Sequence, residues 1–144
     1  MIAIDTNVLL RRLLADDEAQ AARAQRLFES GETILITDIV LAETVWTLKG
    51  KRYGASREDI AAVITSLMEE SSVVFENKQA VWSALHDYLL APPVKTASGE
   101  KLADYADALI INKARLTAEQ MNEHYAGTYT FDQAALAIKG TKRP

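Results

Sequence analysis

The first fourteen residues, MIAIDTNVLLRRLL (Met1–Leu14), place a short apolar run directly before an acid. Met1 to Ile4 predicts a brief strand that ends at Asp5, and the apolar residues after it predict a short helix. Farther along, short apolar runs alternate with helical patterns, which predicts a parallel sheet with helices on both faces. We therefore expect an α/β domain with a central, mostly parallel sheet of four or five strands flanked by helices.

The remaining elements follow from periodicity, caps and breakers. Ser56 and Asp59 have the spacing of a capping box, and Pro92 and Pro93 end a helix. The predicted strands are Met1–Ile4, Thr33–Ile36, Val73–Phe75 and Thr128–Phe131. One predicted helix is capped by Asp16 or Asp17 and reaches about Glu29, and another is capped by Asp38 and contains Ile39–Lys51. The other predicted helices are Val8–Leu14, Ile60–Glu70, Ala80–Ala91, Leu102–Leu116 and Asp132–Gly140. The stretch VKTASGEK (94–101) is predicted to be a polar loop.

Length and composition limit the classes of protein. The chain has 144 residues, 49% of them hydrophobic, which predicts a single domain over residues 1–144 with a real core. It has no cysteine, so it has neither disulfides nor thiolate metal sites, and we expect a cytoplasmic protein. We expect no membrane span and no secretion signal. The net charge of −4 argues against binding nucleic acid through an overall positive field.

Five acids stand out by their position. Asp5 and Asp132 each follow a predicted strand, and sites in parallel sheets lie beyond the carboxyl ends of the strands. Asp104 and Asp107 are three residues apart in an apolar helix, and Glu43 lies among apolar residues of another helix. Buried carboxylates are unfavourable without positive charge, so a cation is expected near them.

Each acid also has a simpler interpretation. Asp5 and Asp132 suit helix N-caps, Glu43 suits a half-exposed helix position, and Asp104 or Asp107 suits a solvated face or an ion pair. Taken together, however, these acids lie where few cations are available to pair with them. Carboxylate and water oxygens are the ligands that Mg²⁺ and Mn²⁺ prefer, and the set therefore predicts a divalent cation site.

Four stretches resemble the acidic motifs of the PIN-domain ribonucleases, and specifically of the VapC-type toxins of toxin–antitoxin pairs. They are IAIDTNVLL, TDIVLAETVWTL, DYADALII and TFD, in the family's order over nearly the whole chain. The resemblance implies the catalytic acids Asp5, Glu43, Asp107 and Asp132, with Asp104 as an additional metal-binding acid. It also implies supporting roles for Thr6 and Asn7, which orient the first acid, and for Thr130.

The resemblance further implies an endoribonuclease that hydrolyses RNA phosphodiester bonds with Mg²⁺ or Mn²⁺, forms homodimers and is inhibited by a cognate antitoxin. The segment 116–129 departs from the family pattern, which predicts a short last strand. A different interpretation is an RNA- or partner-binding PIN-like module without nuclease activity. Catalysis based on histidine is not supported, because His86 lies in an apolar helix and His124 in a polar loop.

Positive charge for RNA has to come from local groups. Two basic clusters flank the first and second acidic motifs, although helix ends also carry cations for simple electrostatic reasons. The candidate RNA contacts are Arg11, Arg12, Lys49, Lys51 and Arg52. Trp46 and Trp82 are interpreted as core or interface residues rather than as platforms for stacked bases.

Overall fold

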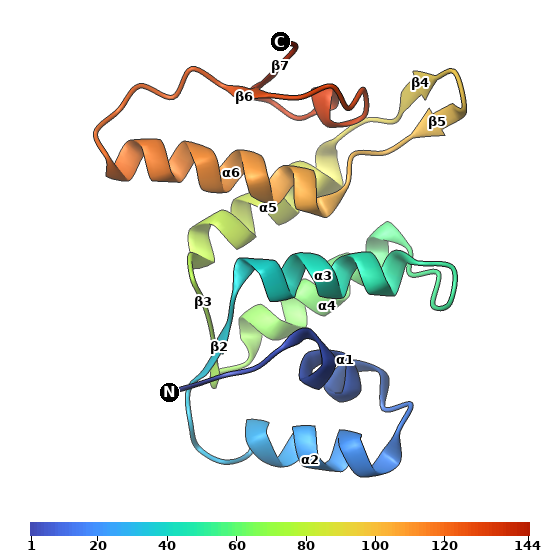
Figure 1. Cartoon of the computed structure of the whole chain (residues 1–144), viewed down its shortest axis with the longest axis vertical. Helices are drawn as coiled ribbons and strands as arrows, with labels where there is room; N and C mark the ends of the chain where they lie inside the picture. Colours follow the sequence, from blue (N-terminus) through green and yellow to red (C-terminus); the bar gives the residue numbers. More distant parts are fainter. The chain divides into compact units, whose positions relative to one another are not determined.

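The computed structural model describes residues 1–144, which divide into two compact units (Figure 1). Three parallel strands form the sheet of the first unit, residues 1–78. The strand order is β1–β2–β3, and Ile34 of the middle strand is in register with Ile2 and Val73. Two helices follow β1 and two follow β2. They form the crossover connections that neighbouring parallel strands require. The elements are β1 (Ile2–Ala3), α1 (Thr6–Leu14), α2 (Glu18–Phe28), β2 (Ile34–Ile36), α3 (Asp38–Lys49), α4 (Arg57–Glu69) and β3 (Val73–Phe75).

Polar side chains begin each helix of this unit. Asp5, Asp17, Thr37 and Ser56 are the N-caps, and each accepts a hydrogen bond from a backbone N–H three residues later. The cap of α3 was expected at Asp38, and this expectation is wrong by one residue. The Thr37 hydroxyl accepts from Val40 N at 3.4 Å, which makes Asp38 the first helical residue.

The core of the first unit lies between the sheet and its helices. Ile34 and Ile36 of the middle strand are fully buried, as are Leu9 of α1 and Leu41 of α3. Ile60 and Ile64 of α4, one turn apart, are also fully buried. This apolar packing fixes β1 and the start of α1, and thereby the acid that lies between them.

The second unit, residues 79–144, contains a helix pair, an antiparallel hairpin and a separate parallel strand pair. Tyr88 and Tyr105 pack edge to face with ring centroids 5.8 Å apart, and the Tyr105 hydroxyl donates to Val81 O at 3.2 Å. The elements are α5 (Lys78–Leu90), which begins at the last residue of the first unit, β4 (Val94–Thr96), β5 (Gly99–Lys101), α6 (Tyr105–Gln120), β6 (Thr128–Tyr129), the 3₁₀ turn η1 (Ala135–Ala137) and β7 (Thr141–Lys142).

The predicted α/β class with parallel strands is confirmed, but these strands form a three-stranded sheet and a separate pair rather than one central sheet of four or five strands. Five strands pair in parallel, three as β1–β2–β3 and two as the pair β6–β7, in which Thr128 is in register with Thr141. β7 follows Asp132 and adds a strand that the sequence did not clearly indicate. No helix in the structure combines the length and the apolar character that crossing a membrane requires.

Two segments differ from their predicted structure. The expected polar loop 94–101 is an antiparallel hairpin, because the Thr96 hydroxyl donates to Gly99 O at 2.7 Å and Gly99 adopts a φ of +109° at the turn. The expected helix Asp132–Gly140 is reduced to the 3₁₀ turn η1. There the chain turns at Gly140, with a φ of +99°, and continues as β7 instead.

Acid should weaken the first unit partly through the capping box of α4. Ser56 N donates to Asp59 Oδ2 at 2.9 Å, and the bonds from Ser56 lower the pKa of the Asp59 carboxyl. A carboxyl with a lowered folded-state pKa stabilises the fold above its unfolded pKa, about 3.9, and this contribution is lost as the pH falls through the folded value. We expect Asp59→Asn to lose less stability than the wild type between pH 5 and pH 2.

Urea unfolding at several pH values would measure this difference. Glu58→Gln is the matched control, since Glu58 is an exposed acid of the same helical turn and makes no side-chain hydrogen bond. The prediction is wrong if Asp59→Asn and the wild type lose the same free energy of unfolding over this interval.

Candidate active site

Asp5 lies directly after β1 and begins α1. Its Oδ1 atom accepts a hydrogen bond from Val8 N at 2.9 Å, so the simple capping interpretation of this acid is correct. The residue is exposed, and its other carboxylate oxygen accepts no hydrogen bond. Capping therefore leaves one oxygen of Asp5 available to a ligand at the N-terminus of the helix.

Glu43 of α3 is brought to the first motif by a side-chain hydrogen bond. The Thr6 hydroxyl donates to Glu43 Oε2 at 2.5 Å, across 37 residues of sequence. Thr6 was expected to orient the first acid, but in the structure its hydroxyl holds the second one. The Asn7 side chain is exposed and makes no hydrogen bond. The first unit thus joins the motifs of Asp5 and Glu43 through the first turn of α1.

Asp104 and Asp107 lie at the beginning of α6. The helix begins at Tyr105, so Asp104 is its N-cap and Asp107 its third residue, and Asp107 Oδ2 accepts from Asp104 N at 3.2 Å. The sequence interpretation placed both acids inside a buried helix, where they would require a cation. That placement is wrong, since both side chains are half-buried at the N-terminus, where the helix dipole itself favours negative charge.

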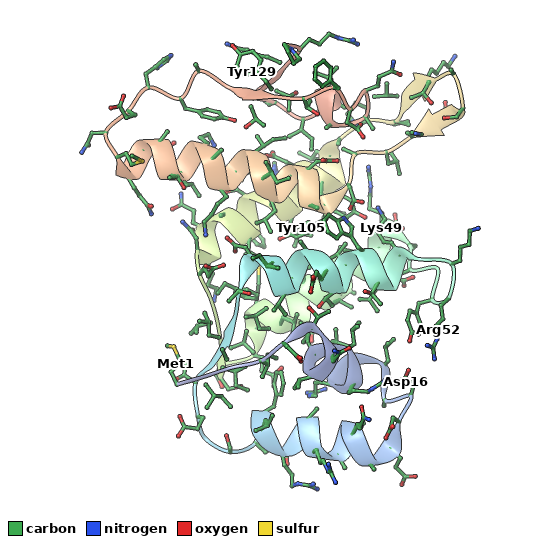
Figure 2. The ribbon with its side chains drawn as sticks, viewed as in Figure 1. Met1, Asp16, Lys49, Arg52, Tyr105 and Tyr129 are labelled. Atoms are coloured by element: carbon green, nitrogen blue, oxygen red, sulfur yellow. The ribbon has the colours of Figure 1, made fainter.

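A small cavity of about 120 Å³ lies beside Asp107. Its wall includes Tyr129 and Thr130 from the β6 segment and Thr141 of β7. Asp107 therefore lines a cavity whose wall contains hydroxyl-bearing as well as apolar residues. Tyr129 lies on the outer strand pair of this unit (Figure 2).

Asp132 lies in the turn after β6. Its Oδ1 accepts hydrogen bonds from Ala134 N at 2.7 Å and Ala135 N at 3.0 Å. Its own N–H donates to the Thr130 hydroxyl at 3.0 Å. Asp132 is exposed, and its second oxygen accepts no hydrogen bond. Asp132 therefore caps the turn as expected and still presents one carboxylate oxygen to solvent.

The five acids are divided between the two units. Asp5 and Glu43 belong to the first, and Asp104, Asp107 and Asp132 belong to the second. Within neither unit do three His, Cys, Asp or Glu side chains gather closely enough to hold a metal ion. The chemistry of the donor set, which is entirely carboxylate and hydroxyl oxygen, fits a hard cation such as Mg²⁺ or Mn²⁺.

The basic residues near the first motif already have partners inside the first unit. Arg11 donates to Asp16 at 2.6 Å and to Gln20 at 2.8 Å, and the bond from Arg11 lowers the pKa of the Asp16 carboxyl. Arg52 approaches the same acid at 3.8 Å (Figure 2). Arg12 lies over the Phe28 ring at 5.2 Å.

To bind the phosphates of RNA, Arg11, Arg12 and Arg52 would have to give up these partners within the first unit. Lys51 is exposed and Lys49 is half-buried.

Several aromatic side chains are not where the sequence suggested. Trp46 and Trp82 were interpreted as core or interface residues; at 55% and 58% exposure neither belongs to the core, and the interface role stays a prediction. Each occupies the outer side of its helix, beside buried residues such as Val45 and Val81 that form the core face. His86 and His124 are exposed, as expected for solvated residues.

Sequence analysis also missed two residues beside Asp132. Lys101 and Phe131 line the same open cavity as this acid. The only signal for Phe131 was its position directly before Asp132, and Lys101 was assigned to a loop.

Parallel strands with helices between them, and an exposed acid, Asp5, directly after the first strand, form an α/β fold. The PIN domain family model matches residues 2–121, and the chain belongs to the PIN domain family. Members of this family are generally metal-dependent nucleases that act on nucleic acid. A comparison with curated protein sequences gave no match. Asp132, β6 and β7 lie beyond the matched residues.

Proposed function

We propose that this protein is an endoribonuclease that hydrolyses RNA phosphodiester bonds with Mg²⁺ or Mn²⁺. One observation carries the proposal. Asp5, Glu43 and Asp132 are exposed, each holds one carboxylate oxygen through a hydrogen bond from a neighbouring group, and none forms an ion pair. Such carboxylates are oriented but not neutralised, as residues that bind a cation need to be.

On the motif resemblance, Asp5 and Asp107 would hold the cation directly and Glu43 or Asp132 would act through water, while Asp104, the N-cap of α6, would support Asp107. The bound cation would neutralise a phosphate oxygen and lower the pKa of a water molecule. Thr6 would hold Glu43 in position, and Thr130 would hold the turn of Asp132. The expected products carry a 5′-phosphate and a 3′-hydroxyl.

Metal dependence tests this function. Purified full-length protein is expected to cleave a single-stranded RNA pool with Mn²⁺ or Mg²⁺ and to lose that cleavage in excess EDTA. Restoring Mn²⁺ should restore the activity, because carboxylate oxygens bind such a cation reversibly. Product ends can be identified by their sensitivity to phosphatase and by ligation.

Two results would contradict the proposal. Equal cleavage with and without EDTA would exclude the cation-dependent chemistry. Tight RNA binding without cleavage under any divalent cation would instead favour the binding-module alternative. A variant that loses two acids, Asp5→Asn with Asp132→Asn, is the control against a contaminating ribonuclease.

We further propose a role as a cytoplasmic VapC-type toxin, with residues 1–144 as one PIN domain. The support is the resemblance of the four motifs and the net charge of −4, which favours a more basic antitoxin. We expect a homodimer in solution, inhibited by the product of a neighbouring gene that covers the acids.

Light scattering of the purified chain would measure its mass, and co-purification with the neighbouring product would test inhibition. A strict monomer whose cleavage is unaffected by that product would contradict this role while leaving the nuclease activity intact.

A further inference from the structure

An open cavity of about 370 Å³ lies in the second unit beside Asp132. The hairpin contributes Thr96, Ser98 and Lys101 to its wall, and the turn after β6 contributes Phe131 and Asp132. The cavity therefore combines an ammonium group, two hydroxyls, an aromatic ring and a carboxylate. All of these residues belong to one unit, so the cavity is complete within it.

Phe131 is held with its ring in solvent. The side chain is 88% exposed, the highest value among the large hydrophobic residues of the chain. The backbone around it is fixed, because Thr130 N donates to Lys142 O at 3.0 Å and Asp132 N donates to the Thr130 hydroxyl at 3.0 Å. Exposing an aromatic ring forgoes the free energy of burying it, about 1.5–3 kcal/mol. A rigid turn that presents such a ring beside an acid suits a ligand with an aromatic face.

Lys101 supplies the positive charge of the cavity. In the hairpin register Val94 pairs with Lys101 and Lys95 pairs with Glu100, so Lys101 and Lys95 project from opposite faces. Lys101 is exposed and makes no ion pair. On the same side of the hairpin, the Thr96 hydroxyl lies 3.2 Å from the Ser98 hydroxyl. Because the Thr96 hydroxyl donates to Gly99 O at 2.7 Å, the Lys101 ammonium and the Ser98 hydroxyl are the donors available to a phosphate oxygen.

We propose that this cavity is a nucleotide subsite for single-stranded RNA, in which one base stacks on Phe131 and an adjacent phosphate contacts Lys101. The inference deepens the proposed nuclease function and rests on it, since Asp132 borders the same cavity. A base inside a duplex has both faces covered, so only an unpaired nucleotide offers a face to Phe131. The subsite would select single-stranded RNA and place its backbone next to Asp132.

RNA binding without metal tests the subsite separately from cleavage. Fluorescence anisotropy would follow a labelled single-stranded oligonucleotide with the full-length protein in EDTA. Phe131→Leu is expected to weaken binding by about 5- to 100-fold, the range for loss of one base–aromatic stack, and Phe131→Trp should preserve it. Lys101→Gln should reduce the slope of log K against log salt by about 0.7, as loss of one phosphate contact on a single strand predicts.

Matched variants control both effects. Lys95→Gln removes the same charge from the opposite face of the hairpin and should leave the salt slope unchanged. Trp82→Ala removes another exposed aromatic of this unit and should leave affinity unchanged. An oligonucleotide with abasic sites should bind the wild type and Phe131→Leu equally.

The subsite is refuted if Phe131→Leu binds RNA as tightly as the wild type, or if Lys95→Gln and Lys101→Gln behave alike. Wild-type protein that binds RNA in this pattern but never cleaves it would refute the nuclease function and leave the subsite standing.

Discussion

Asp107→Asn is expected to lower the rate of RNA cleavage by about 100-fold or more. Loss of groups that merely orient a metal ligand costs about 10–100-fold, so loss of a direct ligand should reach or exceed the upper end of that range. Asparagine keeps the size of the side chain and removes its charge. Metal affinity and cleavage should therefore fall together in this variant.

Asp104 and Asp107 form a capping box at the start of α6, and this predicts that Asp107→Asn stays folded. Its amide oxygen can still accept the hydrogen bond that Asp107 Oδ2 accepts from Asp104 N. Asp104→Asn is the matched comparison, because asparagine is as good an N-cap as aspartate. We expect Asp104→Asn to lose about tenfold or less, since its proposed role is to support Asp107.

Cleavage rates measured against Mn²⁺ concentration, together with urea unfolding, would separate the two acids. Near-normal activity of Asp107→Asn beside an inactive, folded Asp104→Asn would reverse the assignment. Equal losses in both would indicate that the two acids act as one unit. The proposal that Asp107, and not Asp104, binds the cation directly would then be wrong.

Local signals predicted much of the fold. The strand 73–75 and the capping box of Ser56 and Asp59 were read correctly, because both depend on residues close in sequence. The hairpin 94–101 was missed, since its sequence is polar on both faces and gives no alternation of apolar residues. The end of the chain was missed because the small residues after Asp132 suit a helix, and only the pairing of β7 with β6 overrides that preference.

The sequence indicated which residue types belong to the candidate site, but it did not indicate how their side chains are arranged. Sequence analysis selected the five acids as candidates, and that selection stays a prediction. The hydrogen bond from Thr6 to Glu43 joins residues 37 apart and has no local signal. Asp104 and Asp107 were predicted to share one helical face, whereas the helix begins between them. Trp46 was interpreted as a core or interface residue because it is large and apolar, and its exposure, which excludes the core, depends on how α3 is turned toward its sheet.

A buried polar residue of α6 escaped sequence analysis altogether. Asn112 is 1% exposed and uses both ends of its amide. Its Nδ2 donates to Asp87 Oδ2 at 2.7 Å and to Ala108 O at 3.0 Å, and its Oδ1 accepts from Arg115 at 2.9 Å. Asn112 therefore ties α5 to α6 and holds in place the helix that carries Asp107.

Asn112→Ala is expected to lower the free energy of unfolding by about 2–4 kcal/mol. Two of its hydrogen bonds are to charged side chains, and each such bond stabilises a fold by about 1.5–3 kcal/mol. Asp87 and Arg115 are only half-buried, so in the variant water can hydrogen-bond to them and reduce the loss. Urea unfolding would measure the change. Thr117→Ala, at an exposed position of the same helix, should stay within about 0.5 kcal/mol of the wild type.

The double variant tests whether the network itself accounts for the loss. If Asn112 stabilises the unit by satisfying Asp87, then Asp87→Ala combined with Asn112→Ala should cost less than the sum of the single changes, by about 1 kcal/mol or more. Asp87→Asn keeps an oxygen that can accept from Asn112 and should cost little. Strict additivity of the two alanine variants would show that Asn112 acts by filling space, and the polar link between α5 and α6 would then not be what positions Asp107.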